Sequence, residues 1–67
     1  MTATLNSSLL ASASYSPASR TLTVVFNSGK SYTYQNVDIS IFDGLRAAES
    51  PGRFFGKQIR GAFTIAR

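Results

Sequence analysis

The sequence predicts an α+β domain: a three-stranded antiparallel meander, then one longer and one short helix, then a candidate C-terminal strand. Apolar residues alternate with a period of two through the first half of the chain, short turns separate the alternating segments, and helical spacing begins only after residue 38. A chain of 67 residues has room for one core. We expect a single domain over residues 7–67, preceded by a disordered N-terminus over residues 1–6.

Two strands are expected over residues 9–15 and 21–26. One face of the first strand is expected to carry Leu9, Ala11, Ala13 and Tyr15. One face of the second strand is expected to carry Leu22, Val24 and Phe26. Between them Pro17, flanked by serines, supplies turn chemistry.

A third strand is expected over residues 30–34, with Tyr32 and Tyr34 on one face. The preceding Asn27-Ser28-Gly29 is typical of a short hairpin connection, in which Gly29 can adopt a positive φ. Strands joined by such short turns pair antiparallel, and their apolar face needs cover from another part of the chain.

A first helix, expected after residue 38, covers the apolar face of the strands. Asn36 tolerates the left-handed conformation that would end the sheet, and either Asp38 or Ser40 can cap the helix. The stripe that faces the sheet consists of Ile41, Phe42, Leu45 and Ala48. Gly44 lowers the stability of this helix by roughly 1 kcal/mol relative to Ala, unless a neighbouring group approaches too closely for a side chain.

A short second helix is expected over residues 51–59. Ser50 and Pro51 fit its cap and first position, and Gly61 ends it. Residues 62–67 then alternate like a final strand, which either extends the sheet or pairs with a second molecule.

The amino-acid composition limits the kinds of reaction and ligand that the chain can support. The chain has no Cys and no His, which removes disulfides, an imidazole base and the usual zinc ligands, so we expect no enzyme, no metal and no cofactor. The three carboxylates, Asp38, Asp43 and Glu49, lie in or beside one helix, where capping is the expected role. Seven Lys and Arg against three acids give a net charge of +4, which favours anionic partners.

A basic stripe on the second helix is the candidate binding surface. At helical spacing Arg53, Lys57 and Arg60 share one side, with Arg46 and Lys30 as candidates to extend it. Guanidinium groups match phosphate oxygens bidentately, so the stripe suits RNA or another phosphate-bearing ligand. The alternative is an ordinary solvated helix face.

The aromatic residues allow two interpretations. Tyr32 and Tyr34, close to Lys30, either offer stacking platforms for bases or line the core with their hydroxyls at the rim. The core is favoured, because the apolar strand residues need partners. On the second helix Phe55 is expected to be buried, whereas Phe54 is a candidate contact residue or interface anchor.

The order of these motifs resembles the KTSC domain, named from the C-terminus of certain lysyl-tRNA synthetases. The resemblance covers about residues 7–64 and rests on two motifs: Tyr32-Thr33-Tyr34 and the run Ala48-Glu49-Ser50-Pro51-Gly52 followed by Phe55 and Ile59. It implies a compact α+β domain that occurs alone in bacterial and phage proteins or fused to synthetases. It also implies a role in RNA binding, suggested by the synthetase context, and no catalytic residues.

Two positions depart from the family pattern. Asn36-Val37-Asp38 stands where the family usually has Gly-Val-Pro, and both substitutes suit a left-handed turn and a helix start. Gly56 stands where the family often has Asn, which removes a polar side chain beside the basic stripe and weakens the transfer of a binding role to that position.

We therefore expect a small non-enzymatic binding module for RNA, a nucleotide or another phosphate-bearing ligand. Its expected ligand residues are Arg53, Lys57, Arg60, Lys30, Tyr32 and Tyr34. The competing hypothesis is a protein-interaction module, either a homo-oligomer or a phage-type regulator of a host protein, because a chain this short has no disulfide or metal to stabilise its core. No apolar window of about 18 residues is present, so we expect a cytoplasmic protein.

Overall fold

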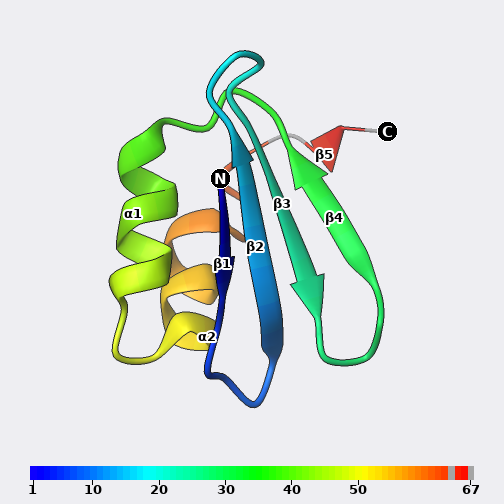
Figure 1. The fold of residues 1–67 in the computed structure, drawn as a ribbon, viewed down its shortest axis with the longest axis vertical. Helices are drawn as coiled ribbons and strands as arrows, with labels where there is room; N and C mark the ends of the chain where they lie inside the picture. Colours follow the sequence, from blue (N-terminus) through cyan, green and yellow to red (C-terminus); the bar gives the residue numbers. More distant parts are fainter. Residues whose placement is uncertain (64, 67) are drawn as a thin grey trace.

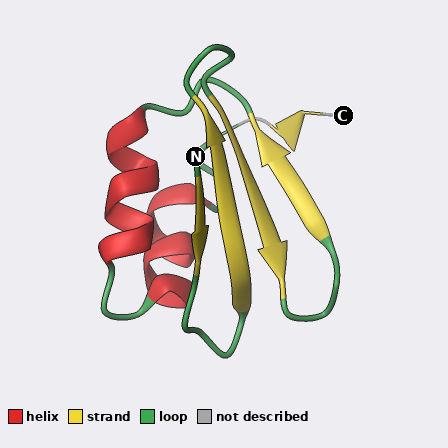
Figure 2. Ribbon diagram, viewed as in Figure 1, coloured by secondary structure: helices red, strands yellow, loops and turns green. Residues whose placement is uncertain are grey.

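The computed structural model describes residues 1–63, 65 and 66, which form an antiparallel sheet with the helices packed on one of its faces (Figures 1 and 2). The five strands follow one another in the sheet in chain order. The elements are β1 (Thr2–Thr4), β2 (Leu10–Ser16), β3 (Thr21–Phe26), β4 (Ser31–Tyr34), α1 (Ile39–Ala47), α2 (Pro51–Phe54), the π-helical turn η1 (Phe55–Ile59) and β5 (Ile65–Ala66).

The expected meander is present as β2, β3 and β4, and a short strand is added at each edge. The expectation of a disordered start needs correction, because β1 pairs antiparallel with β2 and places Thr2 opposite Ser14. The amino group of Met1 also donates a hydrogen bond to the carbonyl of Tyr15, at 3.0 Å. At the other edge the expected strand over residues 62–67 is described only at β5, since residues 64 and 67 lie outside the described residues.

The start of β2 differs from the expected alternation. The register with β3 shifts between Leu10 and Ser12, so Ala11 is an extra residue in the strand. A bulge of this kind moves the residues before it to the opposite face. Leu10 is therefore fully buried, whereas Leu9, which we expected to face the core, is 45% exposed.

Three turns with a positive φ connect the strands of the meander and lead out of it. Gly29 has a φ of +96° in the β3–β4 hairpin and Asn36 has a φ of 57° after β4, as expected. Arg20, in the β2–β3 turn, also has a positive φ, of 56°, which the sequence did not indicate. The carbonyl of Arg20 accepts a hydrogen bond from the N–H of Val37, at 2.9 Å, so this turn fixes the segment that leads into α1.

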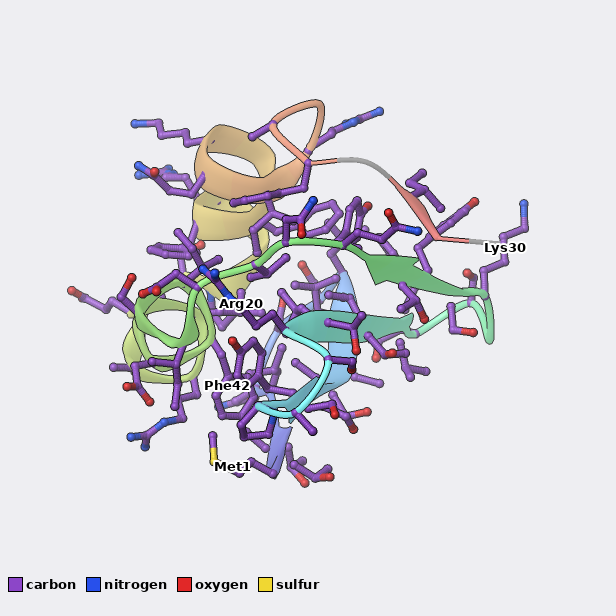
Figure 3. All side chains as sticks on the ribbon, turned by 90° about the horizontal axis from the view of Figure 1, so that it is seen from above. Met1, Arg20, Lys30 and Phe42 are labelled. Atoms are coloured by element: carbon purple, nitrogen blue, oxygen red, sulfur yellow. The ribbon has the colours of Figure 1, made fainter. Side chains whose placement is uncertain are left out.

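Helix α1 begins at the Asp38 cap. Of the two candidate caps Asp38 is the one used: its Oδ2 accepts a hydrogen bond from the N–H of Ser40, at 3.0 Å. Phe42 and Leu45 are buried against the sheet, and Figure 3 shows Phe42 between α1 and the strands.

The second helix spans the residues expected of it but changes its hydrogen bonding midway. It starts with Pro51 at its first turn and is α-helical to Phe54. Over η1 the helix widens, and the N–H of Arg60 bonds to the carbonyl of Phe55, five residues earlier, at 2.9 Å. Phe55 and Ile59 are buried, as predicted.

The core lies between the sheet and the two helical segments. It is built from twelve buried apolar or aromatic residues. They are Leu5, Leu10, Ala13, Tyr15, Leu22, Val24, Tyr34, Val37, Phe42, Leu45, Phe55 and Ile59. Tyr34 is thus part of the core, as favoured, while Tyr32 is half-buried and packs against it.

Candidate functional site

Positive charge is unevenly compensated over the surface. Arg20 Nη2 lies 3.6 Å from Asp38 Oδ1, and Arg46 Nε lies 2.9 Å from Asp43 Oδ1. Both aspartates are therefore paired beside α1. Arg46, considered as an extension of the basic stripe, is one of the paired arginines.

Four other cationic side chains form no salt bridge within residues 1–63, 65 and 66. We call Lys30, Arg53, Lys57 and Arg60 the unpaired cations. All four are exposed. Because no carboxylate of the described residues lies within salt-bridge distance of them, their positive charge remains available to an external anion.

The structure divides the predicted stripe. Arg53 and Lys57 line one surface hollow, whereas Arg60 lines another. The wider π turn accounts for the division, because it rotates the chain by a smaller angle per residue than an α-helix and leaves Arg60 short of the side that α-helical spacing predicts. Arg60 itself has left the helix, with an extended backbone at φ −61° and ψ 119°.

The first hollow, which we call the aromatic hollow, has a volume of about 530 Å³. It lies between β4, the end of η1 and the segment that leads to β5. Two unpaired cations, Lys30 and Arg60, line it, and none of the described residues that line it is acidic. Its other lining residues are Leu9, Phe26, Ser28, Tyr32, Tyr34, Phe55, Gly61, Phe63 and Ile65.

Edge-to-face contacts fix the rings at the base of the aromatic hollow. Phe26 lies 5.7 Å from Tyr32 and 5.3 Å from Phe55, with interplanar angles of 90° and 87°. Tyr34 lies 6.0 Å from Phe55 at 67°. Such pairs are favourable geometries for aromatic rings, so the floor of the hollow is a preformed aromatic surface.

The hydroxyl of Tyr34 has no hydrogen-bond partner in the described part of the chain, although its residue is only 5% exposed. Among the described residues no fully buried side-chain oxygen lacks a partner, and the hollow that Tyr34 lines gives its hydroxyl access to solvent. Burial raises the pKa of Tyr34, nearby Tyr32 raises it further, and the charge of Arg60 lowers it. The hydroxyl is therefore protonated at neutral pH and close to a guanidinium.

Tyr15 provides the contrast. It is 4% exposed, and its hydroxyl donates a hydrogen bond to the carbonyl of Val37, at 2.6 Å. The Tyr15 hydroxyl thus bonds within the fold, whereas that of Tyr34 forms no hydrogen bond to the described residues.

The second hollow, of about 510 Å³, lies along the outer side of the second helix. Arg53, Lys57 and Phe54 line it together with Glu49, Ser50 and Gln58. Phe54, expected as an interface anchor, is half-buried, and the tip of its ring lies against Gly44 of α1. The ring thus packs within the chain along one side.

All six ligand residues proposed from the sequence line one of the two hollows, but their division between the hollows was not predicted. Lys30, Tyr32 and Tyr34, already expected to lie close together on one strand, meet Arg60 in the aromatic hollow, and no sequence spacing indicated that Arg60 joins them. Phe26 and Phe63 were not proposed as lining residues, since Phe26 had been assigned to the core and Phe63 to the last strand. The half-burial of both is consistent with a position at the boundary between core and surface.

Residues 1–63, 65 and 66 contain no group of three or more acidic side chains placed to hold a metal ion. Nor does any helix in this part of the chain have the length and hydropathy needed to span a membrane.

Comparison with known proteins decides the family. Residues 6–63 match the KTSC domain. The chain belongs to the KTSC domain family. The crystal structure of a KTSC domain protein from Yersinia pestis is similar over 100% of this chain and 94% of that one, with a TM-score of 0.92 and 30% sequence identity. The resemblance inferred from the motifs is thereby confirmed.

Two proteins show where KTSC sequences like this one occur. A protein of Tsukamurella paurometabola is 39% identical over 59 residues, which cover 88% of each chain. A lysine–tRNA ligase of Nostoc sp. is 41% identical over 49 residues, which are 73% of this chain and 9% of that enzyme. This KTSC domain thus matches a small part of the ligase.

Proposed function

We propose that this KTSC domain is a non-enzymatic module that binds RNA or another phosphate-bearing ligand. The proposal rests on the positions of the unpaired cations. Each lines one of two hollows that border the second helix, and the two aspartates are already paired with Arg20 and Arg46. The positive excess is therefore gathered where a ligand can reach it.

The chemistry of the two hollows suits nucleic acid. Arg60 and Arg53 can each bind two phosphate oxygens through the planar guanidinium fork, and Lys30 and Lys57 contribute point charges. Aromatic rings beside such cations offer surfaces on which bases stack. The similarity to a segment of a lysine–tRNA ligase supports RNA as the ligand, because that enzyme acts on a tRNA.

Salt dependence of binding tests the proposal. A labelled single-stranded RNA is titrated with the protein at about 50 to 200 mM salt, and binding is followed by fluorescence anisotropy. The logarithm of the affinity should fall linearly with the logarithm of the salt concentration, by about 0.7 per phosphate contacted on a single strand. Arg60→Ala and Lys57→Ala should each weaken binding and reduce the slope by about that amount.

Arg46→Ala is the matched control. It removes the same charge from an exposed arginine, but from one that is paired with Asp43. Its effect on affinity should be small. Absence of binding to RNA and to nucleotides at about 50 mM salt would refute the proposal, and so would an equal loss of affinity in Arg46→Ala and Arg60→Ala.

Self-association is the second candidate, favoured by a different surface. Met1 and Ile39 are 54% and 42% exposed, and both line a hollow of about 430 Å³ beside Phe42. The same region contains β1, an edge strand whose outer backbone groups can pair with another chain. Light scattering across a concentration series should then give a dimer mass that Ile39→Lys lowers to the monomer value. A monomer at all concentrations would exclude this candidate.

A further inference from the structure

The aromatic hollow carries a cation at each end. Lys30 directly precedes β4, while Arg60 is close enough to Tyr34, the last residue of β4, to lower the pKa of its hydroxyl. Figure 3 shows Lys30 projecting from the end of the hairpin. The inward-facing Tyr32 and Tyr34 lie between these two cations along the strand.

The hollow also contains a polar group with no assigned partner. Tyr34 is more than nine-tenths buried and lines the hollow, and its hydroxyl forms no hydrogen bond to the described residues. Such a group, held among aromatic rings, can donate one hydrogen bond to a ligand and fix its orientation. A flat ligand in the hollow can therefore place a polar edge against the hydroxyl of Tyr34.

The size of the hollow limits the ligand. A volume of about 530 Å³ lies within the roughly 300–1,000 Å³ range of small-molecule sites, so one nucleotide fits and a double helix does not enter. In a duplex both faces and the pairing edge of each base are occupied. Only an unpaired base can place a face on an aromatic ring and its pairing edge on a protein hydroxyl.

We infer that the aromatic hollow receives one unpaired nucleotide. Its base lies against the half-buried Tyr32 and Phe63, its polar edge accepts a hydrogen bond from the hydroxyl of Tyr34, and its phosphates meet Arg60 and Lys30. This inference rests on the proposed function, because it needs a phosphate-bearing ligand. The same chemistry is offered by an unpaired position in RNA and by a free nucleotide.

The test compares three ligands with the full chain: a single-stranded RNA, a blunt-ended RNA duplex of the same sequence, and a free nucleoside 5′-monophosphate. We expect the single strand to bind at least tenfold more tightly than the duplex. Tyr34→Phe should weaken binding of the single strand about fivefold to tenfold and leave duplex binding unchanged. Arg53→Ala, outside the aromatic hollow, should weaken both by a similar factor.

Intrinsic fluorescence gives a second readout that does not depend on a substitution. The chain has three Tyr and no Trp, so its emission reports the tyrosines directly. Stacking of a base on Tyr32 should quench it when the single strand binds, and binding of the duplex should not. The quench should persist in Tyr34→Phe at saturating RNA, because Tyr32 remains.

The outcomes separate the two proposals. Equal affinity for single strand and duplex, with no effect of Tyr34→Phe, would overturn the inference while leaving phosphate binding in place. Absence of binding to all three ligands would remove both. A monophosphate that binds as tightly as the RNA would identify a free nucleotide as the ligand, and one that binds more than tenfold more weakly would identify an unpaired position in RNA.

Discussion

The ring of Phe54 rests on the backbone of α1 at Gly44: a Cβ atom at Gly44 would lie 2.6 Å from Cζ of Phe54. Real Cβ atoms do not approach a neighbour this closely, so the absence of a side chain at residue 44 allows the two helices to meet. The intrinsic helix penalty of Gly is thereby offset by close packing.

Gly44→Ala should therefore destabilise the domain, although Ala is the better helix former by about 1 kcal/mol. The added methyl group forces the Phe54 ring to move, and overpacking of this kind costs about 1–3 kcal/mol. We expect a net loss of about 1 kcal/mol in the free energy of unfolding, measured by urea denaturation. In a Phe54→Ala background the same substitution should become stabilising, and a loss of similar size in both backgrounds would contradict the packing explanation.

The two buried tyrosines should respond differently to loss of the hydroxyl. Tyr15→Phe leaves the buried carbonyl of Val37 without its 2.6 Å hydrogen bond, at a cost of about 1–3 kcal/mol. Tyr34→Phe removes a hydroxyl that has no partner in the described chain, and should change the free energy of unfolding by less than about 0.5 kcal/mol. Urea denaturation of both variants checks the contrast, and equal losses would show that Tyr34 also donates a bond within the fold.

Asp38 should make stability depend on acidic pH. Hydrogen bonds from Ser40 lower the pKa of Asp38 below its ordinary value of 3.8, and the charge of Arg20 lowers it further. Because the folded-state pKa is the lower one, this contribution is present above about pH 4 and is lost as the pH falls through the folded pKa. Asp38→Asn keeps a capping oxygen and removes the titration, so the unfolding midpoint of this variant should change less between pH 5 and pH 2.

Much of the fold could be predicted because its signals are local. Alternation over residues 21–26, the positive φ available to Gly29 and Asn36, and the cap at Asp38 each depend on a few neighbouring residues. The pairing of β1 with β2 is different. It depends on contacts across 12 residues of chain, such as that between Thr2 and Ser14, and nothing in Thr2–Thr4 alone distinguishes a strand from a frayed end.

The residues of the candidate site were proposed from the sequence, but their arrangement in space was not. The charged and aromatic types indicated phosphate and base binding, and four of the six ligand residues meet in one hollow. The π turn decides which of them meet, because it separates Arg60 from Arg53 and Lys57. A change from i+4 to i+5 hydrogen bonding leaves no clear mark in the sequence.

The bulge in β2 gives the last prediction. Simple alternation assigns the core position to Leu9, whereas the register shift before Ser12 assigns it to Leu10, which is fully buried. Leu10→Ala should therefore lower the free energy of unfolding by about 2–5 kcal/mol. Because a loss of this size can unfold a small domain, Leu10→Val serves as the milder variant. Leu9→Ala should leave stability within about 0.5 kcal/mol, because its side chain is 45% exposed and lines the aromatic hollow. Circular dichroism and urea denaturation measure both, and a larger loss in Leu9→Ala than in Leu10→Val would mean that the strand runs without the bulge.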